Sequence, residues 1–154
     1  MRRSDREISD PKEIESIILK ADVCRVAMAN DNYPYLVTMN FGYAGGTEKK
    51  LYFHCSGEGK KLDMIRKNNY VCFEFDISHR LYKGKIACDF GMSYQSVVGW
   101  GMISVVTNNE EKKEGLNTIM EHYSGLRDFN YKPLMLEKTF VLRLVITEMT
   151  GKCC

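Results

Sequence analysis

The chain has 154 residues and a formal net charge of +2, from 22 Lys and Arg against 20 Asp and Glu. This charge is too close to neutral to predict a nucleic-acid groove or an anionic membrane surface, and no apolar run approaches the roughly 20 residues of a membrane span. The start of the chain is charged and lacks the apolar segment of a secretory signal, so we expect a cytoplasmic protein with a single domain, residues 1–154.

The first half of the chain predicts one short helix followed by three strands. Asp10 can cap the helix, Pro11 suits its first position, and Glu13 completes a capping box. Isoleucines at helical spacing continue this helix to about residue 21. Apolar and aromatic runs, separated by turns rich in Asn and Gly, then predict strands over residues 23–29, 35–43 and 51–54.

The second half of the chain predicts two helices and three further strands. One helix is expected over residues 60–68 and another over 108–125, where Asn108 can cap the start and Gly125 the end. Residues 79–93 show no readable pattern. The strands are predicted over residues 70–77, 94–107 and 140–146.

Together these elements predict a mainly β fold with six strands and three peripheral helices. Short hairpin turns make neighbouring strands antiparallel. An antiparallel sheet of this size avoids exposed edges most simply by closing on itself. We therefore expect a six-stranded antiparallel β-barrel with helices around it.

The cysteines give no sign of a structural metal. They form no Cys-x-x-Cys pair, and several lie in apolar runs where a thiol usually acts as a small buried hydrophobic group. A disulfide framework is typical of short secreted chains. We expect reduced thiols and no metal site, for the cysteines at positions 24, 55, 72, 88, 153 and 154.

One stretch, residues 38–61, brings polar groups to a single end of the predicted barrel. A strand ends in Thr38-Met39-Asn40-Phe41, its hairpin partner ends in His54-Cys55-Ser56, and a helix opens at Gly59-Lys60-Lys61. A helix start offers free backbone N–H groups and a positive partial charge. Glycine allows a close approach of the backbone, and the hydroxyl and ammonium groups add donors. The pattern indicates a phosphate site, although lysines at a helix start can also be merely solvated.

Most of the chain resembles one family, segment by segment and in the same order. The segments are ADVCRV (21–26), PYLVTMNFGY (34–43), LYFH (51–54), GKKLD with the following residues to Asn68 (59–68), VCFEFD (71–76), SVVGWG (96–101) and ITEMTGK (146–152). They resemble the pyridoxamine 5'-phosphate oxidase-like FMN-binding split barrels, in particular the nitroimidazole-resistance branch. One departure is Asn69, where family members often have proline.

This resemblance implies a homodimer that holds FMN, or alternatively FAD, at the subunit interface. The strand end formed by Thr38, Met39, Asn40 and Phe41 would lie along the flavin ring. Ser56, Lys60 and Lys61 would face the phosphate, with Gly59 allowing the approach. Gln95, Ser96 and Trp100 are expected at the interface near the ring, from the same or the other subunit. Among the aromatic residues, Phe41 and Trp100 are the two expected to stack on a planar ligand.

Two roles are possible for His54, one catalytic and one structural. As a catalytic residue it would lie beside the flavin and donate a proton to the substrate or a hydrogen bond to the ring. As a structural residue it would be a strand-end histidine bonded to a backbone carbonyl. The sequence leaves both open.

The resulting function hypothesis is an FMN-dependent oxidoreductase. It would take electrons from transiently bound NAD(P)H and reduce a small planar acceptor such as a 5-nitroimidazole. The alternative is a flavin- or haem-binding module without turnover, acting as a carrier, sensor or buffer. The sequence does not separate a catalyst from a carrier.

Overall fold

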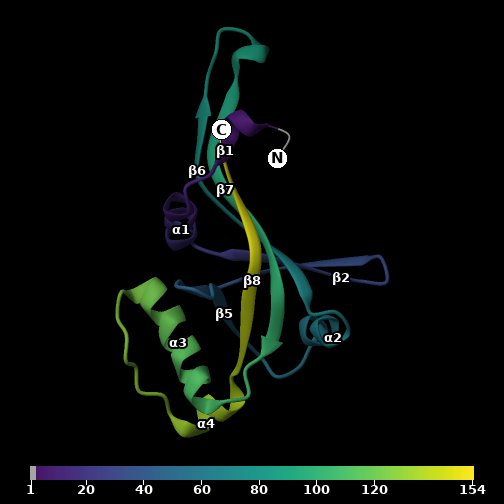
Figure 1. The fold of residues 1–154 in the computed structure, drawn as a ribbon, viewed down its shortest axis with the longest axis vertical. Coiled ribbons are helices and arrows are strands. Elements are labelled where there is room, and N and C mark those ends of the chain that lie inside the picture. Colours follow the sequence, from purple (N-terminus) through teal and green to yellow (C-terminus); the bar gives the residue numbers. More distant parts are fainter. Residues whose placement is uncertain (1–2) are drawn as a thin grey trace.

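The computed structural model describes residues 3–154 (Figure 1). Within them the chain forms one antiparallel sheet of eight strands, in the order β3-β2-β6-β7-β8-β5-β4, with the short β1 paired to β8. The strands are β1 (Glu7–Ile8), β2 (Cys24–Asn30), β3 (Tyr33–Met39), β4 (Phe41–Ala44), β5 (Lys50–Cys55), β6 (Tyr70–Tyr82), β7 (Gly91–Val105) and β8 (Phe140–Cys153). The helices are α1 (Pro11–Lys20), α2 (Lys60–Lys67), α3 (Asn109–Ser124) and α4 (Pro133–Lys138), with 3-10 turns at Ser4–Arg6 and Ala87–Asp89.

The two edges of this sheet are joined by a single residue. β3 and β4 lie at opposite ends of the strand order, yet Asn40 alone separates them in the chain. The sheet must therefore curl until its edges meet at Asn40, without a hydrogen-bonded ladder between β3 and β4. This is a split barrel, as predicted. The count of eight strands exceeds the expected six because the run over 35–43 divides at Asn40 and because β1 was not foreseen.

The segment without a readable pattern, residues 79–93, continues β6 and β7 into a long hairpin. Figure 1 shows this hairpin projecting from the body of the molecule, with the 3-10 turn near its tip. The register of the ladder shifts between Ile77 and Arg80, and Ser78 has a φ of +61°. This irregularity breaks the alternation of side chains, so the sequence pattern fails there.

The core fills the inside of the barrel, and α1 packs against β6 and β7 and adds the buried Ile14, Ile17 and Ile18 to it. Four phenylalanines lie at its centre with no exposed surface: Phe41, Phe53, Phe73 and Phe75. On the outside, α3 packs against β4 and β5. Gly42 permits this approach, because a Cβ there would lie 2.5 Å from the backbone N of Ile119.

The predicted helix ends follow from their caps. The Asp10 carboxylate accepts a hydrogen bond from the backbone N–H of Lys12 at 2.9 Å, and the Asn108 side chain accepts one from Glu111 at 3.0 Å. Gly125 ends α3 with a φ of +69°, a conformation that favours glycine. Only α4 was not predicted, although Pro133 at its first position is a helix-start signal.

Candidate functional site

Three segments meet where the two edges of the sheet join. Phe41 pairs with Phe53, so the same antiparallel register places Asn40 opposite His54, one step beyond the ladder. The Lys61 ammonium, in the first turn of α2, lies 3.3 Å from the sulfur of Met39. The end of β3, the end of β5 and the start of α2 are thus neighbours in space.

The start of α2 presents a set of polar residues, which we call the α2 cradle: Ser56, Gly59, Lys60 and Lys61. The Ser56 hydroxyl donates a hydrogen bond to the Glu58 carbonyl at 3.1 Å. Gly59 precedes the helix with a φ of +119°, and a Cβ added there would meet no atom within 4 Å. No side chain within residues 3–154 caps this helix, and the Leu62 N–H already donates to the Gly59 carbonyl at 3.0 Å, so the N–H groups of Lys60 and Lys61 are the ones left for another acceptor. Such a donor set fits the phosphate of a nucleotide cofactor.

The two lysines of the α2 cradle differ in their contacts. The Lys60 ammonium donates a hydrogen bond to the Tyr33 hydroxyl at 2.8 Å and lies 4.1 Å above the centre of that ring and 5.0 Å from that of Tyr35. Among the described side chains, the Lys61 ammonium has one hydrogen-bond partner, the weak acceptor Met39 Sδ, and no ion pair. Lys61 therefore keeps its charge available for an anion, whereas Lys60 is held by the tyrosines.

The strand end over residues 38–41 alternates between the two faces of the sheet. Thr38 and Asn40 are exposed, whereas Met39 is 7% exposed and Phe41 is fully buried. The Phe41 ring packs 4.8 Å from Phe75 and 4.3 Å from His122, measured between ring centres. The expectation that Phe41 stacks on a ligand therefore needs correction, because this ring belongs to the core.

The second group of expected site residues lies on β7, apart from the first. Ser96 faces Asp76 of β6, and Trp100 faces Cys72. β2 and β6 separate β7 from β3, and three strand spacings amount to about 14 Å. Gln95 instead donates a hydrogen bond to Glu13 at 3.4 Å. Within one chain, Gln95, Ser96 and Trp100 do not touch the α2 cradle.

A charged cluster occupies the outer face between these two groups. Arg25 bridges Glu74, at 3.0 Å, and Asp76, and His79 Nε2 lies 2.9 Å from the Asp76 carboxylate. Burial and the neighbouring Asp76 raise the pKa of Glu74 above its usual value. The outer face of β2 and β6 is therefore polar next to Thr38 and Ser96.

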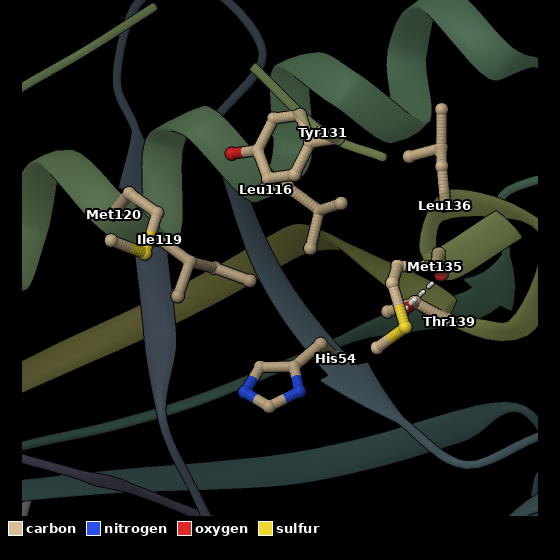
Figure 2. A pocket seen from close by; sticks show the side chains of 8 residues that line it. All are labelled: His54, Leu116, Ile119, Met120, Tyr131, Met135, Leu136 and Thr139. Atoms are coloured by element: carbon tan, nitrogen blue, oxygen red, sulfur yellow. Dashed lines mark hydrogen bonds between the residues drawn. The ribbon is translucent and has the colours of Figure 1, made fainter. Parts of the chain in front are cut away.

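His54 points away from the barrel core into a cavity of about 310 Å³ (Figure 2). Its neighbour Phe53 points into the core, as the alternation of a strand requires. In residues 3–154 the His54 ring has no hydrogen-bond partner, so the structural reading with a backbone carbonyl finds no support. The cavity is lined by His54, Leu116, Ile119, Met120, Tyr131, Met135, Leu136 and Thr139.

Comparison with known proteins assigns the family. The model of the pyridoxamine 5'-phosphate oxidase family matches residues 10–153. The chain belongs to this family. No curated protein matched the sequence.

Solved structures of similar proteins share this fold. A "putative 5-nitroimidazole antibiotic resistance protein" from Bacteroides thetaiotaomicron is 36% identical, with a TM-score of 0.84 over 96% of this chain and 86% of that one. The flavocytochrome Anf3 from Azotobacter vinelandii is 18% identical, with a TM-score of 0.79 over 100% of this chain and 72% of that one. An FAD and haem binding protein from Mycobacterium smegmatis is 15% identical, with a TM-score of 0.80 over 96% and 73%.

The sequence indicated the helix face of α3 but missed the part of the cavity wall that follows it. Tyr131 lies in the connection to α4, and α4 supplies Met135 and Leu136. The start signal at Pro133 was the one available sign of this element. Within the described part of the chain, no helix is long and apolar enough to cross a membrane.

Proposed function

We propose that this member of the pyridoxamine 5'-phosphate oxidase family binds FMN at the α2 cradle and acts as a flavin-dependent oxidoreductase. The observation that carries the proposal is the donor set of the α2 cradle beside the outward-facing Thr38 and Asn40. The proposal is supported by the names of two similar solved structures, a flavocytochrome and an FAD and haem binding protein. FAD is the alternative cofactor, since its pyrophosphate needs the same kind of donors.

In this proposal each group of the chain has a simple role. The backbone N–H groups of Lys60 and Lys61 and the Lys61 ammonium hold the phosphate, and the open space at Gly59 lets it approach. Thr38 and Asn40 offer polar side chains to the flavin ring. When bound, FMN supplies the redox chemistry, taking two electrons from NAD(P)H and passing electrons to the acceptor.

We propose that a second copy of the chain covers the outer face of β3, β2, β6 and β7. The register aligns four apolar side chains across these strands: Leu36, Ala27, Cys72 and Trp100. Leu36 is 60% exposed in the single chain, which is unusual for a leucine inside a continuous apolar row. A two-fold dimer through this face would bring Ser96 and Trp100 of one subunit toward the flavin of the other, whereas Gln95 stays on the opposite face beside Glu13.

The proposed acceptor is a small planar molecule, with a 5-nitroimidazole as the specific candidate. The name of the 36% identical protein from Bacteroides thetaiotaomicron supports this choice. A second candidate function is a flavin- or haem-binding module without turnover. The names of the flavocytochrome and of the FAD and haem binding protein favour it as the alternative.

Anaerobic reduction of the purified protein, loaded with FMN, distinguishes these functions. We expect NADH or NADPH to bleach the absorbance near ~450 nm that is typical of a bound flavin, and a 5-nitroimidazole to restore it with formation of a reduced product. Bound flavin that responds to neither reagent would favour the binding module. Protein that takes up neither FMN nor FAD would overturn the reductase, and protein that takes up neither flavin nor haem would overturn both functions.

A further inference from the structure

We infer that Tyr123, together with its neighbour His122, closes the split of the barrel and positions the strand end over residues 38–41 for the flavin ring. Both residues lie in the last turn of α3, and we call them the split latch. The inference deepens the proposed function and rests on it, because this strand end matters for binding only if a flavin lies along it.

The split leaves the free side of β4 without a strand as its partner. β4 is the last strand of the order, and within residues 3–154 no ladder joins it to β3. Phe41, the first residue of β4, is fully buried, and its backbone N–H donates a hydrogen bond to the Tyr123 hydroxyl at 3.2 Å. A buried N–H without an acceptor is costly. A side chain 82 positions further along the chain therefore supplies the acceptor at the point where the sheet is open.

The same hydroxyl reaches across the split to the other edge of the sheet. It donates a hydrogen bond to the Asp22 carbonyl at 2.7 Å. Asp22 lies in the connection between α1 and β2, two residues before Cys24, which pairs with Met39 of β3. One end of this bridge therefore belongs to the edge formed by β2 and β3, and the other end belongs to β4. Tyr123 joins the two edges where no ladder does.

His122 adds a second connection between the same two regions. Its Nε2 lies 2.9 Å from the Ala21 carbonyl, and this nitrogen carries the ring proton because a carbonyl can only accept. The imidazole ring also packs on the Phe41 ring, with 4.3 Å between the ring centres. Figure 1 shows this end of α3 on the side of α1, in agreement with the contact to Ala21. The split latch thus holds both the backbone and the ring of Phe41.

The split latch lies directly beside the residues that we propose for contact with the flavin ring. Asn40 immediately precedes Phe41, and Thr38 lies two residues before Asn40 on the same exposed face. Fixing Phe41 therefore limits the movement of both polar side chains, and a preorganised site loses less free energy on binding. The phosphate is proposed to bind the α2 cradle, which the split latch does not contact. Tyr123 is therefore a positioning residue for the ring side of the flavin site.

The test compares the dissociation constants of FMN and riboflavin for the wild-type protein and for Tyr123→Phe, measured by fluorescence quenching. This variant keeps the aromatic ring and removes both hydrogen bonds of the hydroxyl. We expect both flavins to bind about fivefold more weakly or worse, and by the same factor, because the ring side of the site is loosened while the phosphate side is intact. Lys61→Ala, in contrast, should weaken FMN and leave riboflavin unchanged.

The matched control is Tyr43→Phe, on the same strand as Phe41. The Tyr43 hydroxyl donates a hydrogen bond to Glu15 of α1 at 3.0 Å, so this variant also removes a hydroxyl contact of β4 but leaves the split latch in place. Both flavin affinities should stay within about twofold of the wild-type values. The visible circular dichroism of bound FMN at saturation reports the surroundings of its ring. We expect Tyr123→Phe to change this spectrum, and Tyr43→Phe to leave it unchanged.

If Tyr123→Phe does not fold, His122→Phe takes its place with the same expectations, because it keeps a ring and removes the donor to Ala21. Unchanged flavin affinities, a loss confined to FMN, or an equal loss in Tyr43→Phe would overturn the inference. Weaker binding with an unchanged spectrum would also overturn it, since Tyr123 would then act only through stability. Wild-type protein that binds neither flavin would overturn the proposed function, and the inference with it.

Discussion

The two halves of the expected flavin site are built in different ways. The half around the α2 cradle comes from segments that one chain folds together, through the join at Asn40 and the contact between Lys61 and Met39. The half on β7 lies three strands away; Ser96 and Trp100 are on the outer face of the sheet, whereas Gln95 is on the opposite face, where it bonds Glu13 of α1. The first half can be complete in a single chain, whereas the second reaches a flavin only if another copy supplies it.

The largest expected effect is a loss of stability in the first half of the site, and it separates the side chains that belong to the core from those that do not. Phe41→Ala should lower the free energy of unfolding by about 3–5 kcal/mol, because the buried ring leaves a cavity. Thr38→Ala, at an exposed position of the same strand end, should change it by no more than about 0.5 kcal/mol. Urea denaturation followed by circular dichroism measures both. If Phe41→Ala lowers the free energy of unfolding only slightly, the Phe41 ring is not part of the core, and its assignment to the ligand site stands.

The second half depends on the proposed dimer face. Leu36→Asp should raise the dissociation constant of the dimer by about a hundredfold, because it would bury an unpaired carboxylate in the apolar row. Leu134→Asp, at a similarly exposed leucine of α4, serves as the matched control and should have no effect. Sedimentation velocity at several concentrations reports the change. If Leu36→Asp leaves the dissociation constant of the dimer unchanged, the dimer interface does not include the face that contains Leu36.

Within the first half of the site, Lys60 and Lys61 should contribute differently to FMN binding. Lys61→Ala should weaken FMN binding by about tenfold or more, since it removes a charge-assisted contact to the phosphate. Lys60→Ala should weaken it by no more than about threefold, because Lys60 is held on Tyr33 and Tyr35. Fluorescence quenching of FMN gives both affinities. The opposite order would assign the phosphate to Lys60.

The smallest expected effect lies in the charged cluster between the halves. The pKa of Glu74 is raised in the folded protein, so the protonated carboxyl stabilises the folded state below the unfolded pKa, and this stability is lost as the pH rises from there through the higher folded pKa. Glu74→Gln should therefore be neutral or slightly stabilising at pH 7, within about 1 kcal/mol. The difference in stability between Glu74→Gln and the wild-type protein should disappear at pH values below the usual pKa of glutamate. Denaturation midpoints at several pH values test it, and marked destabilisation at pH 7 would contradict it.

The sequence predicted the elements best where local chemistry decides them. Asp10, Asn108 and Gly125 mark helix ends through bonds and dihedral angles within a few residues. The division at Asn40 leaves no such trace, because buried Met39 and Phe41 continue the alternation on either side. Whether Phe41 points inward or toward a ligand depends on the curl of the whole sheet.

For the candidate site, too, the sequence predicted what local chemistry decides and missed what depends on contacts between distant segments. Its segments could be grouped from strand and helix ends, but the difference between Lys60 and Lys61 depends on Tyr33 and Tyr35 of another hairpin. The cavity beside His54 depends on how α3 and α4 pack over β5, although these elements are far apart in the sequence. Such contacts cannot be obtained from periodicity alone.

The most direct test compares FMN with riboflavin, which has the same ring system but no phosphate. The account predicts that the wild-type protein binds FMN at least about tenfold more tightly than riboflavin, because the α2 cradle holds the phosphate. It also predicts that Lys61→Ala narrows this ratio. Equal affinities for the two flavins, or no binding of either, would contradict the assignment of the α2 cradle to a flavin phosphate.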